Sequence, residues 1–177
     1  YKIKFLPGGF DITTNKEVTN TLSSVSSKSE AVSSNTATLN ITPISTIMSS
    51  IVESKITSGE TITESTLDNS KETLSTVFGI SAEDIGNNYI DSGNSDIAKT
   101  INQINTTINS LAAATDITGD DIIGSLAEVI ENSVDTSGET VTSNFSLSDS
   151  NSLTSVVSQV QTDNSSVSID TNVVTNV

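Results

Sequence analysis

The chain contains no cysteine, no histidine and no tryptophan, and its seven basic residues are all lysines. Without thiols or imidazoles it cannot form disulfides, the usual zinc or haem sites, a cysteine nucleophile or a histidine-based catalytic triad. No apolar run reaches the roughly 18 residues that suggest a membrane-spanning helix. We therefore expect no membrane insertion.

Positive charge is also scarce: seven lysines stand against 22 acidic residues, which gives a formal net charge of −15. Clustered lysine and arginine bind phosphate backbones, and an anionic membrane surface repels an acidic chain. We therefore expect neither nucleic acid nor a lipid surface as a partner. The chain starts at Tyr1 without an initiator methionine, which is typical of a processed product or an excised segment.

Aromatic residues make up 3% of the chain and hydrophobic residues 33%, so a core must consist of isoleucine, valine, leucine and alanine. The 177 residues suit one domain with a modest core and irregular flanks. After Thr42 and Pro43, a favourable N-cap and first helical residue, apolar residues recur with helical spacing. This pattern predicts a helix of about 13 residues that ends before Gly59.

Helical periodicity continues along the rest of the chain. Isoleucines spaced 4-3-4-3 between Ile97 and Leu111 give a narrow apolar seam, which we expect to face the protein's own core rather than a partner chain. A short helical turn is expected at 81–86. Three other helices are predicted. One begins at a capping box, Thr61–Glu64, and ends at Gly79. Another begins at Thr118 or Asp116, and the last begins near Ser146 or Ser148.

Strand signals are weaker and lie mainly near the start of the chain. "YKIKFLPGG" alternates and then breaks, which predicts a strand and a turn, and Thr36–Ile41 also alternates. Overall the sequence predicts a mainly α fold, a small bundle of four to five antiparallel helices. We place the bundle at 42–161, a short β-containing lead-in packed on it at 1–41, and an extended tail or linker at 162–177.

Two segments, "GGFDITTNKE" at 8–17 and "LNITPISTIMSSIVE" at 39–53, resemble a recurring helical module of large secreted bacterial proteins. In that module a Gly-Gly-x-Asp turn precedes a helix that starts with Thr-Pro, and the order of segments matches over about residues 5 to 135. Asn15 stands where the module has glycine, and Ser45 where it has threonine. The resemblance implies a structural or adhesin-like part of a multidomain protein, located outside the cell or on its surface.

The loop that ends in "DSGNSD" concentrates carboxylate, amide and hydroxyl oxygens. Calcium prefers several flexible oxygen ligands, although the spacing is not that of an EF-hand. In the competing interpretation, Ser95 or Asp96 caps the following helix and the rest of the loop is solvated. The candidate calcium ligands are Asp84, Asp91, Asn94 and Asp96, and we expect no other cofactor.

Other acidic residues suit structural roles better. Asp120 and Asp121 fall in the first turn of a predicted helix, where negative charge complements the helix dipole. A weak strip from Glu128 to Glu139 is expected to be a solvated face. Glycoside hydrolysis needs two carboxylates in a cleft and usually aromatic platforms for the sugar, and this chain has few aromatic residues. A serine–lysine catalytic pair is not indicated either, because "SSKSE" has the character of a surface segment. We therefore expect no enzyme activity.

Three hypotheses for function remain. The first is a non-catalytic module of an extracellular surface protein that spaces or anchors other domains of the same protein. The second is a self-assembling subunit of a surface layer or filament, in which "YKIKFL" or "SVSIDTNVV" adds a strand to an identical subunit. The third, and least favoured, is a carboxylate-based hydrolase domain.

Overall fold

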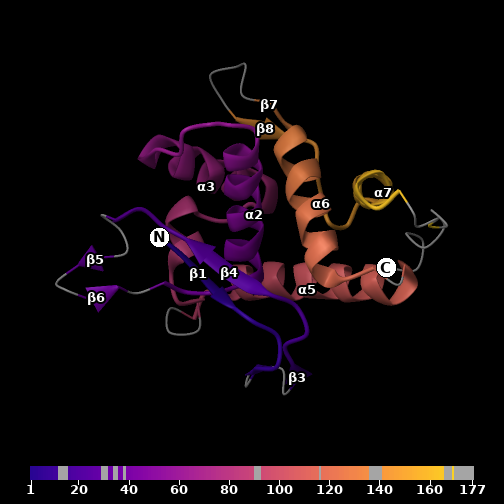
Figure 1. The fold of residues 1–177 in the computed structure, drawn as a ribbon, viewed down its shortest axis with the longest axis horizontal. Coiled ribbons are helices and arrows are strands. Elements are labelled where there is room, and N and C mark those ends of the chain that lie inside the picture. Colours follow the sequence, from indigo (N-terminus) through magenta and orange to yellow (C-terminus); the bar gives the residue numbers. More distant parts are fainter. Residues whose placement is uncertain are drawn as a thin grey trace.

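The computed structural model describes residues 1–11, 16–28, 32–33, 36–37, 39–89, 93–115, 117–135, 141–165 and 169. Within these residues, five α-helices and a short 3-10 helix form a bundle, accompanied by four pairs of short strands (Figure 1). The predicted mainly α fold with a β-containing N-terminal lead-in is confirmed. The helices are α2 (Pro43–Thr57), α3 (Glu64–Phe78), η1 (Ala82–Gly86), α5 (Ser95–Thr115), α6 (Gly119–Asn132) and α7 (Ser150–Asp163).

Helices α2 and α6 lie side by side at the centre of the bundle, and each of them also contacts α3 and α5. In Figure 1, α5 runs crosswise below the two central helices, and α7 packs on the far side of α6. The segment at 81–86, predicted as a helical turn, is η1, which packs against α3. The bundle therefore encloses α2 from several directions, which explains why so much of that helix is buried.

The first turn of α2 has the predicted cap. The side chain of Thr42 accepts a hydrogen bond from the backbone N–H of Ser45 at 3.1 Å, and the Ser45 hydroxyl accepts one from the N–H of Thr42 at 2.8 Å. Pro43 occupies the first helical position, where it has no N–H to leave unpaired. The Thr-Pro pair is therefore a helix start, and the prediction for this junction is confirmed.

Three other helix starts differ from the prediction by a few residues. The capping box of α3 pairs Thr63 with Thr66 instead of beginning at Thr61. The side chain of Asn94, not Ser95 or Asp96, accepts the free N–H groups at the start of α5. In each case the cap residue is the one that precedes the first helical turn, and its neighbours are equally suitable in type.

At the start of α7, Asp149 is the cap instead of Ser146 or Ser148. Its carboxylate accepts hydrogen bonds from the backbone N–H and from the hydroxyl of Ser152, both at 3.0 Å. These two bonds favour the charged form and hold the pKa of Asp149 below its usual value. For α6, the predicted cap Thr118 is confirmed.

The core consists almost entirely of aliphatic side chains, as the composition predicted. The isoleucine seam of α5 points inward, since each of its members is at most 5% exposed. One continuous cluster joins α2, α3, α5, α6 and α7. Its largest fully buried side chains are Ile44, Ile47, Met48, Ile51, Leu74, Ile104, Ile108, Leu111, Ile122, Leu126, Ile130 and Val156.

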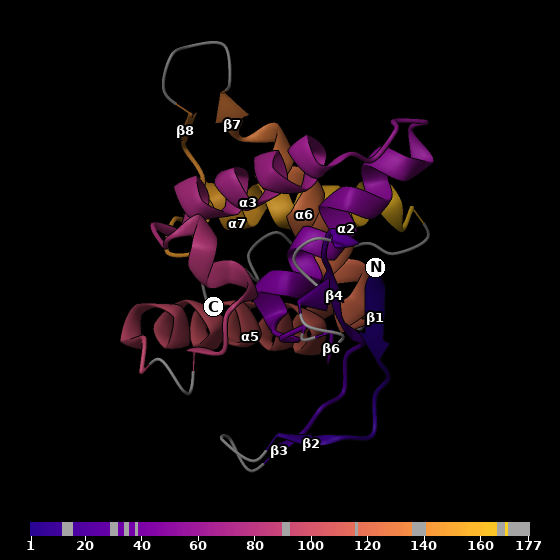
Figure 2. The ribbon, with the colours of Figure 1, turned by 90° about the vertical axis from the view of Figure 1, so that its left-hand side faces the viewer.

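The strands form four separate antiparallel pairs among the described residues. β1 pairs with β4 on the face of the bundle, and the β2–β3 pair extends from these strands away from the helices (Figure 2); we call the two pairs together the N-terminal hairpin. Of the predicted strand over Thr36–Ile41, Thr36–Ala37 form β6 and 39–41 are not in a strand, while residue 38 lies outside the described residues. The strands are β1 (Lys2–Phe5), β2 (Phe10–Asp11), β3 (Lys16–Glu17), β4 (Leu22–Val25), β5 (Val32–Ser33), β6 (Thr36–Ala37), β7 (Val134–Asp135) and β8 (Thr142–Ser143).

Most of the predicted C-terminal tail lies outside the described residues. Thr162 and Asp163 belong to the last turn of α7. Ile169 is buried against the core, and its backbone carbonyl accepts a hydrogen bond from the side chain of Gln161 at 2.7 Å. The division of the chain into lead-in, bundle and tail stays a prediction.

Candidate functional site

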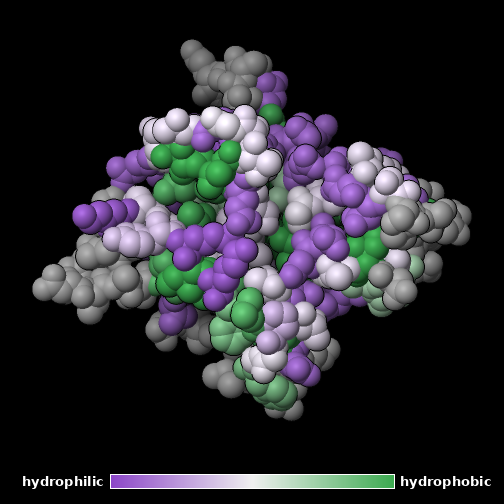
Figure 3. All heavy atoms as spheres, viewed as in Figure 1, coloured by the Kyte–Doolittle hydropathy of each residue, from purple (hydrophilic) through white to green (hydrophobic). Residues whose placement is uncertain are grey.

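Exposed apolar side chains are concentrated at the N-terminus. In the described part of the chain, five of the six large hydrophobic residues with exposed side chains lie within the first ten residues. The whole sequence has only four phenylalanines and two tyrosines, and three of these six aromatic residues fall in the same short stretch. Figure 3 shows hydrophobic side chains at the surface over this part of the hairpin. The five residues are Tyr1, Ile3, Phe5, Leu6 and Phe10.

The hairpin is firmly attached to the bundle through β4. The backbone N–H of Ser23 donates to the Thr46 hydroxyl at 2.9 Å, and the Ser45 hydroxyl donates to the Ser23 carbonyl at 2.8 Å. Just before β4, the N–H of Thr21 donates to the Asp120 carboxylate at 2.7 Å. Side chains of α2 therefore bond to the outward-facing backbone of Ser23 in β4, and a side chain of α6 bonds to Thr21 just before the strand.

The other strand, β1, is an edge strand. It pairs with β4 alone among the described residues, in the register that places Lys2 opposite Val25 and Phe5 opposite Leu22. Figure 2 shows β1 at the margin of the molecule, with β4 between it and the helices. Exposed edges with apolar side chains are sites where other chains can add a strand.

Lys2 and Lys4 of β1 both reach toward the helices, where each forms an ion pair with Glu53 of α2. Val25, which lies opposite Lys2, also packs against the core. Because side chains alternate along a strand, Ile3 and Phe5 lie on the opposite face of the hairpin. The hairpin thus has a lysine-bearing inner face and an apolar outer face.

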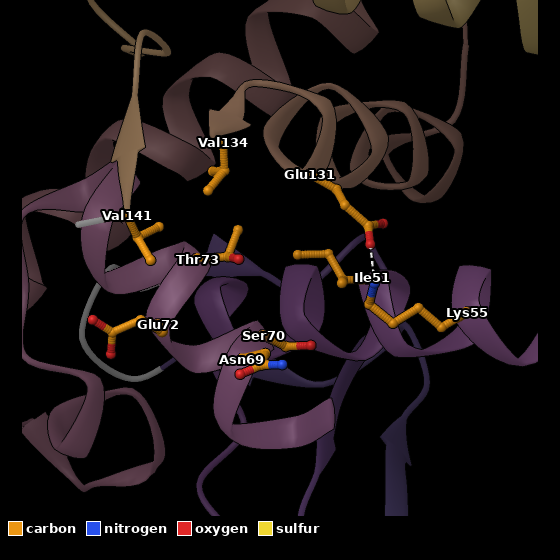
Figure 4. Close-up of a pocket in the computed structure, with 9 residues that line it drawn as sticks. All are labelled: Ile51, Lys55, Asn69, Ser70, Glu72, Thr73, Glu131, Val134 and Val141. Carbon is orange, nitrogen blue, oxygen red and sulfur yellow. Dashed lines mark hydrogen bonds and ion pairs between the residues drawn. The ribbon is translucent and has the colours of Figure 1, made fainter. Parts of the chain in front are cut away.

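A second feature is a groove of about 410 Å³ between α2, α3, α6 and the β7–β8 pair (Figure 4). Its floor includes the buried Ile51, and its rim includes Val134 and Val141. Most of its remaining lining is polar, from Asn69, Ser70, Glu72 and Thr73, with Lys55 and Glu131 on one wall.

The charged groups of this groove do not converge on one point. Lys55 and Glu131 form an ion pair with each other, and both side chains are about three-quarters buried, at 21% and 27% exposed. Figure 4 places Glu72 on the opposite side of the groove from Glu131. The ion pair joins α2 to α6, and the geometry favours a structural role for it.

Of the candidate calcium ligands, three lie in the described part of the chain and Asp91 lies outside it. The Asp84 carboxylate accepts a hydrogen bond from the Asn94 side-chain amide at 3.0 Å, and Asp96 forms an ion pair with Lys99 at 3.1 Å. The structure thus brings Asp84 and Asn94 together and turns Asp96 toward its own helix. In the described ranges no three acidic side chains gather closely enough to hold a metal ion.

Four of the remaining acidic residues named from the sequence lie at helix contacts, whereas Asp135 lies in β7 and Glu139 lies outside the described residues. Asp121 accepts a hydrogen bond from the Thr118 hydroxyl at 2.6 Å, whereas Asp120 fastens the chain before β4. Glu128 and Glu131, predicted to be solvated, are each partnered by a side chain of another helix, Gln159 and Lys55. None of the described helices is both long and apolar enough to cross a membrane.

The groove was not predicted from the sequence, whereas "YKIKFL" in the hairpin was named as a segment that could add a strand to an identical subunit. The groove is formed by residues that are up to 90 positions apart, from Ile51 to Val141, and no local pattern indicates it. The hairpin had a usable signal, since half of the aromatic residues fall in ten positions. A scan of protein-family models found no match to the chain, and searches of curated proteins and of solved structures found none either.

Proposed function

We propose that the chain is a non-catalytic structural module of an extracellular bacterial surface protein, which anchors or spaces neighbouring domains through its N-terminal hairpin. The observation that carries this proposal is the set of five exposed apolar residues on a hairpin attached to an otherwise well-buried helical core. Contiguous exposed apolar surface is typical of an interaction site, and aromatic residues are enriched in the centres of interfaces.

The character of the hairpin supports a protein partner. Tyr1, Phe5 and Phe10 offer large apolar contact areas with few rotatable bonds. The bonds of Ser23 to α2 and of Thr21 to α6 hold β4, and with it the paired β1, against the bundle, which lowers the ordering cost of binding there. A surface attached in this way suits the permanent connection of two domains.

The extracellular location rests on the resemblance of residues 8–17 and 39–53 to modules of secreted bacterial proteins. The acidic surface, rich in serine and threonine, is compatible with such a location. Calcium bound near Asp84 and Asn94 would belong to the same proposal, as a stiffening element. A thermal melt with millimolar calcium and with chelator tests it, and an unchanged midpoint would exclude a stabilising site.

The central experiment is site-specific photo-crosslinking in cells of the source organism. A photoreactive phenylalanine analogue replaces Phe10, and in a matched control it replaces Phe78, which lies in α3 away from the hairpin. We expect the Phe10 position to crosslink to another domain or polypeptide that is accessible to protease on intact cells. Crosslinks to cytosolic proteins only, or equal crosslinking from both positions, would contradict the proposal.

A second candidate function is self-assembly through strand addition, which the outer edge of β1 favours because no other described strand pairs with it. Sedimentation of the chain over a wide concentration range tests it. Oligomers that grow with concentration and disappear when residues 1–6 are removed would support this candidate. A constant monomer mass would exclude it.

A further inference from the structure

We infer that the outer edge of β1 accepts an extended segment of a different polypeptide or domain, in which two carboxylate residues flank one apolar residue. This inference rests on the proposed function, because it takes the N-terminal hairpin as the docking surface. It adds the backbone geometry and the chemical character of the partner.

The backbone groups available on β1 follow from the pairing at its start. The N–H of Tyr1 donates to the Ser26 carbonyl at 2.8 Å, and the N–H of Ser26 donates to the Tyr1 carbonyl at 2.9 Å. Hydrogen-bonded pairs alternate with non-hydrogen-bonded pairs along an antiparallel ladder. Ile3 therefore directs its backbone groups toward β4, whereas Lys2 and Lys4 direct theirs outward.

The backbone N–H and C=O groups of Lys2 and Lys4 are thus the groups on β1 with which an added strand can pair. Growth of the sheet on the other side is blocked, since the backbone of Ser23 in β4 is already bonded to Ser45 and Thr46. An added strand must therefore pair with β1, and its residues opposite Lys2 and Lys4 lie on the same face as these lysines.

The side chains define what that strand must contain. On the inner face, Lys2 and Lys4 share one described anionic partner, Glu53, so two ammonium groups face one carboxylate. Carboxylates of an incoming strand would balance this charge. On the outer face, Ile3 and Phe5 are each more than two-fifths exposed and would be covered by an apolar residue. Alternation of acidic and apolar residues satisfies both faces.

A second copy of this chain is a poor occupant. Antiparallel pairing of β1 with β1 would bring Lys2 and Lys4 of the two copies next to each other, and like charges opposite each other destabilise a ladder. The sequence also has no suitable acidic segment, because no two of its 22 acidic residues are separated by a single residue. These two facts favour a partner from outside the chain.

The test uses the full 177-residue chain and two synthetic peptides, Thr-Glu-Val-Glu-Val-Thr and Thr-Lys-Val-Lys-Val-Thr, followed by amide NMR shifts. Measurements at 0.15 M salt limit the long-range repulsion from the net charge of −15, since the screening length is then about 8 Å. We expect the glutamate peptide to bind at least about tenfold more tightly and to shift the amide signals of Lys2 and Lys4 most.

Proline variants distinguish edge pairing from other binding. Lys4→Pro removes an outward N–H, so we expect it to abolish peptide binding while the melting temperature stays close to that of the unchanged chain. Lys4→Gln keeps the N–H and loses the charge, and binding should weaken without disappearing. Ile3→Pro removes an N–H that points to β4 and should disrupt the hairpin itself.

The outcomes separate this inference from the proposed function. If the peptides bind equally, or if Lys4→Pro binds like the unchanged chain, the inference is wrong even when crosslinking from Phe10 succeeds. If the chain forms oligomers that Lys4→Pro abolishes, the occupant is a second copy and the inference is also wrong. If crosslinking from Phe10 fails as well, the docking role of the hairpin is lost altogether.

Discussion

Apolar side chains in α2 and in the N-terminal hairpin differ sharply in exposure: Ile47 is fully buried, whereas Leu6 is 68% exposed and Phe10 61%. Both regions belong to one chain and touch each other through β4. Burial of apolar area is the main favourable term in folding, so the exposed residues contribute little to the stability of the isolated chain. The bundle is built for its own stability, and the hairpin is suited to contact with something else.

The largest expected effect tests this comparison most directly, because the same leucine-to-alanine substitution is made in the core of the bundle and in the hairpin. Leu126→Ala removes a fully buried side chain of α6 and should lower the free energy of unfolding by about 2–5 kcal/mol. Leu6→Ala, in the exposed stretch, should change it by less than about 0.5 kcal/mol. Denaturant unfolding followed by circular dichroism measures both. Similar losses for the two variants would show that the hairpin is part of the core.

Loss of a hydrogen bond that attaches the hairpin to the bundle should have the next largest effect on the free energy of unfolding. Thr46→Val keeps the shape of the side chain and removes the hydroxyl that accepts from the buried N–H of Ser23. An unsatisfied buried donor costs about 1–3 kcal/mol, and hydrogen exchange should accelerate in β4 and β1. The control is Thr57→Val, since the Thr57 hydroxyl is exposed and donates to the Glu53 carbonyl of its own helix. Equal effects of the two variants would contradict the role of Thr46.

The contributions of two ion pairs, Lys55–Glu131 and Lys99–Asp96, to stability should differ by a smaller amount. Glu131→Gln breaks the partly buried pair with Lys55 on the wall of the groove and should cost about 0.2–1 kcal/mol. Asp96→Asn removes the exposed pair with Lys99 and should leave the melting temperature unchanged within error. A melt at low and at high salt measures both. Should the order of the two effects reverse, the Lys55–Glu131 pair does not help to join α2 to α6.

The effect of pH on the stability of the chain concerns the start of α7. Because the pKa of Asp149 is lowered by its bonds to Ser152, its contribution to stability is fully present above the unfolded value, near pH 4, and fades as the pH falls through the folded value. Asp149→Ala should therefore lower the melting temperature at pH 7, and the difference from the unchanged chain should shrink toward pH 3. A difference that stays constant with pH would contradict the assigned cap.

Local patterns predicted the helices well because both the apolar periodicity and the caps are short-range properties. Thr42 and Thr118 could be assigned as caps from the sequence, whereas Thr63, Asn94 and Asp149 could not, since nearby residues of the same types compete for each position. The crosswise placement of α5 depends on side-chain packing across the whole bundle, and no residue spacing indicates it.

The candidate site was harder to predict than the fold. β4 reads as a polar segment with Ser23 and Ser24 between Leu22 and Val25, and it becomes a buried strand only because α2 supplies hydroxyl partners for its backbone. Without β4 in place, the outer edge of β1 cannot be recognised. The calcium candidates depended on a loop whose central residue, Asp91, lies outside the described part of the chain.

The most direct test of the central claim is hydrogen exchange at single backbone amides of β1. In the free chain, the amide of Phe5, which is paired with β4, should exchange slowly, and the amide of Lys4, which points outward, should exchange rapidly. Addition of the glutamate peptide should slow exchange at Lys4 and leave Phe5 almost unchanged. Protection of Lys4 equal to that of Phe5 in the free monomer, or no change at Lys4 with saturating peptide, would contradict an open docking edge.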